Sequence, residues 1–99
     1  MRQQKFKIGD TVIVLSNATI WVLDNPDAFT MPNGKFDSNY KNAKKIALAA
    51  AKNETIKGKV VKVGAPDDNN DYFYGVQIDL PAKYFAFYDI KDLRKVYAT

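Results

Sequence analysis

The clearest strand signal in the sequence is Tyr72-Phe73-Tyr74-Gly75-Val76-Gln77-Ile78-Asp79-Leu80. Successive side chains of a strand point to opposite faces of a sheet, so this stretch has two distinct faces. One face would carry Tyr72, Tyr74, Val76, Ile78 and Leu80, and the other would carry Phe73, Gly75, Gln77 and Asp79. The first set is entirely apolar, which predicts a strand with one buried face.

Stretches on both sides of it also predict strands. They are rich in β-branched and aromatic residues and cover residues 8–15, 56–63, 83–90 and 94–97. Residues 91–93 predict a single helical turn before the last strand, and residues 19–23 a further short strand. Both faces of residues 8–15 are apolar, so we expect both to be covered.

One helix is predicted, over residues 40–52, capped by Ser38 or Asn39. Its alanine-rich composition is the strongest helix signal in the chain. The expected inner stripe, at helical spacing, is Tyr40, Ala43, Ile46, Ala47 and Ala50. The expected outer side carries Lys41, Lys44, Lys45 and Lys52.

The order of these elements resembles an SH3-like small barrel, of the broad kind that includes KOW and Tudor-like modules. The stretches that carry the resemblance are residues 6–14, 58–63, 74–78 and 84–88 as four strands, and 92–96 as the one-turn helix and closing strand. The resemblance implies a mainly β fold: a five-stranded SH3-like small barrel with one inserted α-helix. Residues 1–99 would form a single domain, in which residues 16–55 are a loop-plus-helix insertion between the first and second strands. Such barrels bind peptides, methylated side chains, nucleic acids or proteins, so the fold leaves the function open.

The composition excludes several kinds of site. The 99 residues include no cysteine and no histidine, so thiolate ligands, disulfides and imidazole bases are absent. Glu54 is the only glutamate, and the five glycines form no phosphate-binding loop. We therefore expect no enzyme activity, no cofactor and no metal. Asp67, Asn69 and Asp71 have the spacing of a calcium loop, but Tyr72 stands where that loop needs glycine, so a solvated turn is the prediction.

The sequence also bears on location. It shows no secretory leader and no run of apolar residues long enough to span a membrane. We expect a cytoplasmic protein that does not enter the membrane.

Two candidate binding surfaces emerge. The net charge is +4, and residues 35–62 carry eight lysines against only Asp37 and Glu54. The helix lysines, joined by Lys35, Lys57 and Lys59, would track phosphates or meet an acidic partner, unless they are simply a solvated helix face. The second surface is aromatic: Trp21, Phe73, Phe85, Phe87, Tyr88 and Tyr97. Beside Lys62 or Lys83 these rings would stack bases or clasp a side chain; the alternatives are burial under the insertion or a homodimer contact.

The leading functional hypothesis is a non-catalytic binding module, a small adaptor or inhibitor that docks on a protein partner through residues 16–55. A compact domain like this suits a bacterial or phage accessory protein. The candidate partner-binding residues are Trp21, Lys41, Lys44, Lys45, Lys52, Phe85 and Phe87. The alternative is a nucleic-acid-binding barrel that uses the helix lysines and strand aromatics. A third hypothesis is a binder of a small anionic ligand such as a nucleotide.

Overall fold

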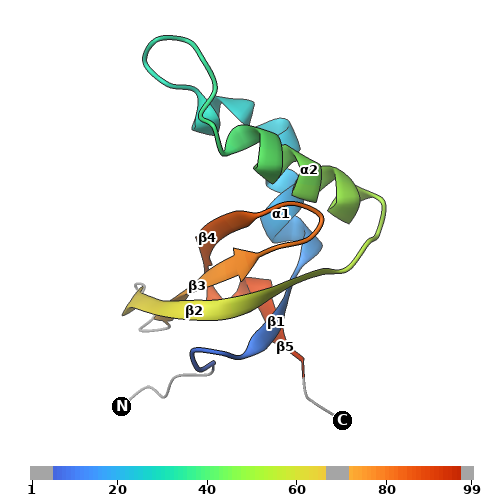
Figure 1. Ribbon diagram of the computed structural model, residues 1–99, viewed down its shortest axis with the longest axis vertical. Helices are drawn as coiled ribbons and strands as arrows, with labels where there is room; N and C mark the ends of the chain where they lie inside the picture. The colour runs from blue at the N-terminus through green and yellow to red at the C-terminus, as the bar shows by residue number, and fades with distance from the viewer. Residues whose placement is uncertain (1–5, 67–71, 97–99) are drawn as a thin grey trace.

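The fold is built on a five-stranded antiparallel sheet (Figure 1). The computed structural model describes residues 6–66 and 72–96. The strands are β1 (Thr11–Val14), β2 (Ile56–Pro66), β3 (Tyr72–Ile78), β4 (Tyr84–Tyr88) and β5 (Leu93–Lys95). Their order in the sheet is β4-β3-β2-β1-β5, so β4 and β5 are its two edges. The predicted mainly β fold is confirmed, but in the described ranges no pairing joins β4 to β5, and the sheet is open rather than a closed barrel.

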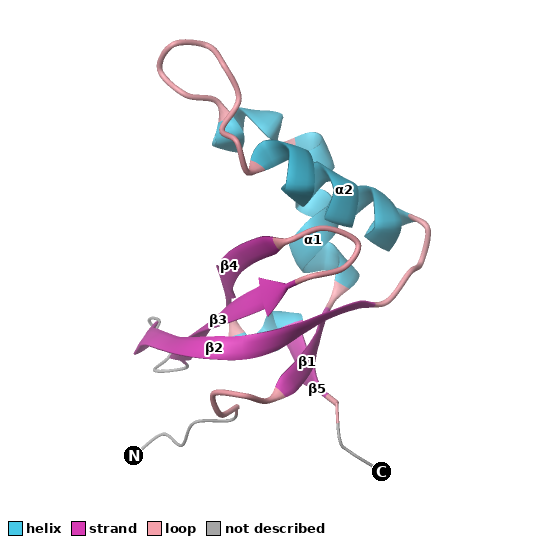
Figure 2. Cartoon of the chain, in the orientation of Figure 1, coloured by secondary structure: helices cyan, strands magenta, loops and turns pink. Residues whose placement is uncertain are grey.

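Between β1 and β2 the chain forms two α-helices that lie together at one end of the sheet (Figure 2). They are α1 (Ser16–Asp24) and α2 (Tyr40–Ala51), joined through the short 3₁₀ helix η1 (Pro26–Phe29). The strand predicted over residues 19–23 is wrong, because these residues belong to α1. Thr19 and Val22, three residues apart, are both buried on the same side of this helix, and the Thr19 hydroxyl donates a 2.9 Å hydrogen bond to the carbonyl of Ser16. Burial of Thr19 and Val22 on one side of the helix outweighs the weak β preference of residues 19–23.

The predicted helix over residues 40–52 is confirmed as α2. Ala43, Ile46, Ala47 and Ala50 are buried as the pattern predicts, and Ala49 is buried as well. Tyr40 is only half-buried. Asn39 occupies the N-cap position, but its side chain makes no capping hydrogen bond. None of the helices in the described part of the chain is long and apolar enough to cross a membrane.

Several strand boundaries differ from expectation. β2 continues to Pro66 through two irregularities in its pairing with β3, and β4 is shorter than the predicted residues 83–90. The helical turn predicted before the last strand is the 3₁₀ helix η2 (Ile90–Asp92). The calcium-like stretch 67–71 and Tyr97 lie outside the described residues.

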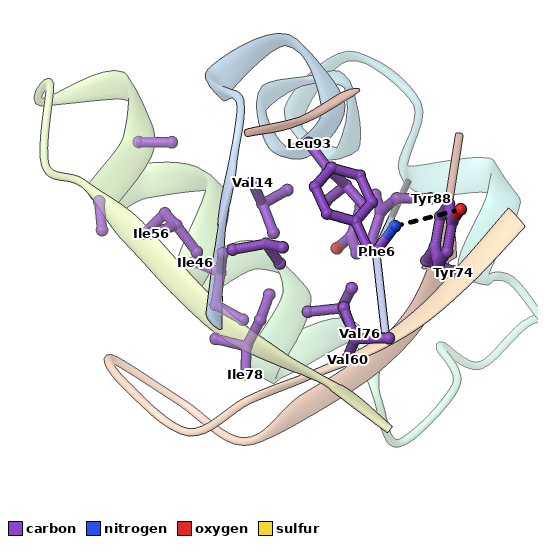
Figure 3. Packing of buried hydrophobic residues seen from close by; sticks show 13 residues of the cluster. Phe6, Val14, Ile46, Ile56, Val60, Tyr74, Val76, Ile78, Tyr88 and Leu93 are labelled. Carbon is purple, nitrogen blue, oxygen red and sulfur yellow. Dashed lines mark hydrogen bonds between the residues drawn. The ribbon is translucent and has the colours of Figure 1, made fainter. Parts of the chain in front are cut away.

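One core joins the sheet to the helices between β1 and β2 (Figure 3). Tyr74, Val76 and Ile78 are buried, which confirms the alternation read from the sequence, whereas Leu80 lies beyond β3 and is 79% exposed. In the same cluster, Ile46 projects from α2 beside Ile78 and Ile56. Its other buried members are Phe6, Val12, Val14, Ala49, Ala50, Val60, Tyr88 and Leu93. The expectation that both faces of the first strand are covered holds for Val12 and Val14 but not for Ile13, which stays partly exposed.

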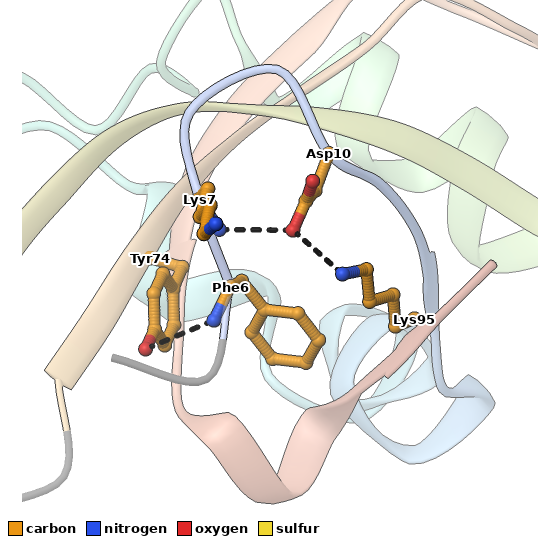
Figure 4. A network of polar contacts seen from close by, with 5 residues as sticks. All are labelled: Phe6, Lys7, Asp10, Tyr74 and Lys95. Carbon is orange, nitrogen blue, oxygen red and sulfur yellow. Dashed lines mark hydrogen bonds and ion pairs between the residues drawn. The ribbon is translucent and has the colours of Figure 1, made fainter. Parts of the chain in front are cut away.

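Polar contacts tie the segment before β1 to the rest of the sheet (Figure 4). The Asp10 carboxylate accepts a 2.9 Å hydrogen bond from the backbone N–H of Lys7 and lies 3.5 Å from the Lys95 ammonium of β5. The Phe6 backbone N–H donates to the Tyr74 hydroxyl at 3.4 Å, and the two rings meet edge to face at 5.0 Å. These contacts fix the entry into β1 against both β3 and β5.

Candidate functional site

A cleft of about 480 Å³ lies between the insertion and the sheet. One wall is α1, through Asn17, Ala18 and Trp21, and the opposite wall is β4, through Ala86 and Phe87. Further lining comes from α2, with Ala43 and Ile46, and from Thr19, Val22, Phe73, Tyr84 and Tyr88. The volume and the mainly apolar lining are those of ordinary ligand-binding clefts.

The cleft runs along the free edge of β4. Consecutive residues of a strand point to opposite faces of its sheet, yet Ala86, Phe87 and Tyr88 all line the cleft. Lining residues from both faces of this edge strand place part of the cleft against its free side, while Phe73, Asp89 and Asp92 carry the cleft on past its end. The other edge of β4 is paired with β3 from Tyr84 to Tyr88.

One end of the cleft is charged. Asp89, Lys91 and Asp92 line it, at and after the end of β4. Burial raises the pKa of the Asp92 carboxyl above its ordinary value; Lys91 lowers this pKa and Asp89 raises it. Two carboxylates therefore outnumber one ammonium at this end, and Asp92 is partly withdrawn from water.

The two tyrosines of the cleft remain protonated. Burial is the main cause that raises the pKa of Tyr84, with a contribution from Asp37. Burial also raises the pKa of Tyr88 well above its usual range, helped by Tyr84 and Asp92. Their hydroxyls are therefore neutral groups that can donate and accept hydrogen bonds.

Trp21 stands at the edge of the cleft and begins a row of rings. It is 40% exposed and stacks on Phe29, with ring centroids 5.9 Å apart. Phe29 contacts Tyr40 at 5.5 Å, and Tyr40 stacks on Phe36 at 4.4 Å. One face of the Trp21 ring is thus covered by Phe29, and the residue stays partly exposed where it lines the cleft.

Phe85 and Phe87 lie on the outer face of the sheet and meet edge to face at 5.3 Å. They are 42% and 45% exposed, so the insertion does not bury them. Each ring takes the space left by a glycine of another strand, Gly75 of β3 for Phe85 and Gly64 of β2 for Phe87. A Cβ atom on Gly75 would come within 2.8 Å of the Phe85 ring, and one on Gly64 within 3.2 Å of the Phe87 ring.

The structure brings only some of the predicted binding residues together. Trp21 and Phe87 line the same cleft from opposite sides, while Phe85 lies next to Phe87 outside it. Lys41, Lys44 and Lys45 on α2, and Lys52 just after its end, are exposed and do not line the cleft. Lys44 instead lies over the Tyr40 ring, with its Nζ atom 6.0 Å from the centroid, and Lys62 of β2 lies over Phe87 at the same distance.

The sequence did not predict the polar end of the cleft or its α1 wall. Asn17, Asp89 and Asp92 belong to no recognisable motif, and the α1 wall is a helix where the pattern predicts a strand.

In the described ranges, no group of three acidic side chains gathers into a possible metal site.

No protein-family model, no curated protein and no solved structure matches this chain significantly.

Proposed function

We propose that this protein is a non-catalytic binding module that docks a protein partner in the cleft between α1 and β4. The observation that carries the proposal is the pair Trp21 and Phe87, two partly exposed aromatic side chains on opposite sides of one mainly apolar cleft. Tryptophan and other aromatic anchors in such positions contribute most of the binding energy of many protein interfaces.

An SH3-like architecture belongs to the same proposal. The strand order β4-β3-β2-β1-β5 and the 3₁₀ turn η2 directly before β5 support it. In this interpretation residues 16–55 are an insertion between the first and second strands, and the binding site forms where that insertion meets the fourth strand. The lack of cysteine suits a cytoplasmic protein.

The test is capture of partners from an extract of cells that produce the protein. Immobilised wild-type protein is compared with the Trp21→Ala and Phe87→Ala variants, and with Leu80→Ala as the matched control. Leu80 is 79% exposed and does not line the cleft, so its removal changes a large apolar side chain elsewhere. We expect a partner that the wild type and Leu80→Ala retain and that both cleft variants lose. Equal capture by all four proteins would contradict the proposal.

A second candidate function, single-stranded nucleic-acid binding, is supported by the outer face of the sheet. Lys59 and Gln77 pair across the strands next to Phe85, and Lys62 pairs with Gly75 next to Phe87. The five described strands contain lysine and arginine but no aspartate or glutamate. Lysines beside exposed rings are the arrangement that binds phosphates and stacks bases.

This candidate is tested by fluorescence anisotropy with labelled single-stranded DNA and RNA at low and at physiological salt. Binding that survives physiological salt and weakens in Phe85→Ala and Lys62→Ala would favour it over the protein partner. A small anionic ligand is disfavoured in the cleft itself, because Asp89 and Asp92 would repel it.

A further inference from the structure

We infer that the partner enters the cleft as an extended peptide segment, which adds a strand to the free edge of β4 and places a lysine or arginine side chain against Asp89 and Asp92. The inference rests on the proposed function, because it names the occupant of the same cleft.

The two edges of the sheet differ in a way that points to β4. Natural proteins protect edge strands by keeping them short or by placing charged residues, proline or bulges in them. β5 has three residues, Leu93-Arg94-Lys95, and two of them are basic. β4 is Tyr84-Phe85-Ala86-Phe87-Tyr88, longer and uncharged, and it pairs with β3 in unbroken register. β4 therefore carries none of these protections.

β4 is an edge strand, so its backbone has N–H and C=O groups that can bond to an added strand. In an antiparallel sheet, every second residue of an edge strand points its N–H and C=O away from its neighbour. Within residues 6–66 and 72–96, no other element forms hydrogen bonds with the outward groups of Tyr84–Tyr88. The carbonyl of Lys83, just before the strand, accepts a 2.8 Å hydrogen bond from the Asn42 side chain of α2. The free edge thus begins where α2 closes on the chain and runs on towards Asp89.

The cleft supplies what a strand added to this edge needs. Main-chain hydrogen bonds give such complexes their affinity, and pockets for alternate side chains give specificity. Trp21 on α1 faces the edge from across the cleft, and Phe87 lies on the edge itself. Side chains on one face of an added strand would pack between them.

The charges at the Asp89 and Asp92 end of the cleft favour a basic side chain on the bound peptide. Asp89 and Asp92 face only Lys91 among the charged residues that line the cleft. In the described residues the only ion pair is that of Lys95 with Asp10, so neither cleft carboxylate has a cationic partner within 4 Å. Burial of Asp92 raises its pKa, and a cation placed beside it would offset that loss of solvation. The protein as a whole has a net charge of +4, which makes this acidic end a local exception.

The experiment uses random peptides of about ten residues displayed on phage, long enough to add a strand to an exposed sheet edge. The immobilised target is the full chain, and synthetic copies of the selected peptides are titrated in solution. We expect selected sequences that share a lysine or arginine. We expect their affinity to fall about tenfold or more in Asp89→Asn/Asp92→Asn, which removes both charges without changing side-chain size.

The strand geometry is tested on the peptide rather than on the protein, so folding of the variant is not at issue. Peptides are N-methylated at one backbone position at a time. Because only alternate residues of an added strand bond to its neighbour, methylation should abolish binding at every second position and be tolerated between them. The control protein is Asp79→Asn, an exposed carboxylate that does not line this cleft, and it should bind like the wild type.

The outcomes separate this inference from the proposed function. Selected peptides that need Trp21 and Phe87 but neither the carboxylates nor alternate N–H groups would overturn the inference and leave the docking cleft in place. Acidic consensus sequences would overturn it as well. So would a dimer of this chain, seen by analytical ultracentrifugation, that competes with the peptides and is unchanged in Asp89→Asn/Asp92→Asn.

Discussion

Gly75 lies at a position of the outer sheet face where a side chain would clash with its neighbours. The ring of Phe85 and the Cβ atom of Lys62 both occupy the space that a side chain there would need, at 2.8 Å and 3.1 Å. Added volume in a closely packed position forces neighbours out of their preferred rotamers. We predict that Gly75→Ala lowers the free energy of unfolding by about 1 kcal/mol, the low end for overpacking because the Phe85 ring is partly exposed, as measured by urea denaturation.

The Phe85→Ala background separates this clash from other effects of the substitution. With the ring removed, the two shortest contacts of the added methyl group disappear, and Gly75→Ala should cost clearly less than in the wild type. An equal cost in both backgrounds would show that the ring over Gly75 does not restrict this position.

The Asp10 carboxyl group makes the free energy of unfolding depend on pH in the acidic range. The backbone N–H of Lys7, and then Lys95, lower the pKa of its carboxyl below the ordinary value of 3.8. A carboxyl whose pKa is lower in the folded state stabilises the fold above its unfolded pKa, and this contribution is lost as the pH falls through the folded pKa. We predict that wild type is more stable than Asp10→Asn at neutral pH and that the difference shrinks below about pH 4. Urea midpoints at a series of pH values provide the measurement; a difference that is constant with pH would refute the role of this charge.

At the level of elements, the sequence predicted the strands and α2 and failed at α1. Alternation over residues 72–80 and helical spacing over residues 40–52 are long, regular patterns, and they were confirmed over residues 72–78 and 40–51. Residues 19–23 combine β-branched and aromatic side chains, which favour a strand locally. They form a helix because Val22 packs against Ala43 and Ala47, and that contact exists only once α2 is present. Short segments whose conformation is set by a distant partner are not readable from their own residues.

The contact between the two helices can be tested at Val22. It is 3% exposed and packs against Ala43 and Ala47. We predict that Val22→Ala lowers the free energy of unfolding by about 1.5–3 kcal/mol, from two buried methyl groups and the space they leave. Leu48→Ala, at a 45% exposed position of α2, should change stability by much less. Equal effects of the two substitutions would mean that α1 does not pack on α2 as described.

At the scale of the whole molecule, the candidate site is beyond what the sequence can predict. Trp21 and Phe87 stand far apart in the chain, and their approach depends on where α1 lies relative to the edge of the sheet. The sequence did single out both residues as partner-binding candidates, and their role in binding stays a prediction. The lysines of α2 came from the same reasoning, but their helix presents them away from the cleft lining.

The helices between β1 and β2 should unfold together with the sheet, because α2 and the strands share one core. Ile46 of α2 is 1% exposed and belongs to the same buried cluster as β1, β2 and β3. We predict that Ile46→Ala lowers the free energy of unfolding by about 2–5 kcal/mol and that Trp21 fluorescence and far-ultraviolet circular dichroism report the same midpoint. Separate midpoints for the two signals would show that the helices melt independently of the sheet.

The position of β1 has a consequence for how the chain is made. β1 lies between β2 and β5, and its residues Val12–Val14 pair with Leu93–Lys95 near the opposite end of the sequence. During synthesis the ribosome releases β1 before β2, β3, β4 and β5, so one side of β1 waits until residues 93–95 have emerged before its hydrogen bonds can form. Contacts so distant in sequence slow folding, and unpaired apolar strands are the surfaces that chaperones protect. The nascent chain therefore completes its sheet only after residues 93–95 have emerged, and the speed of that last step sets how long β1 stays exposed to aggregation.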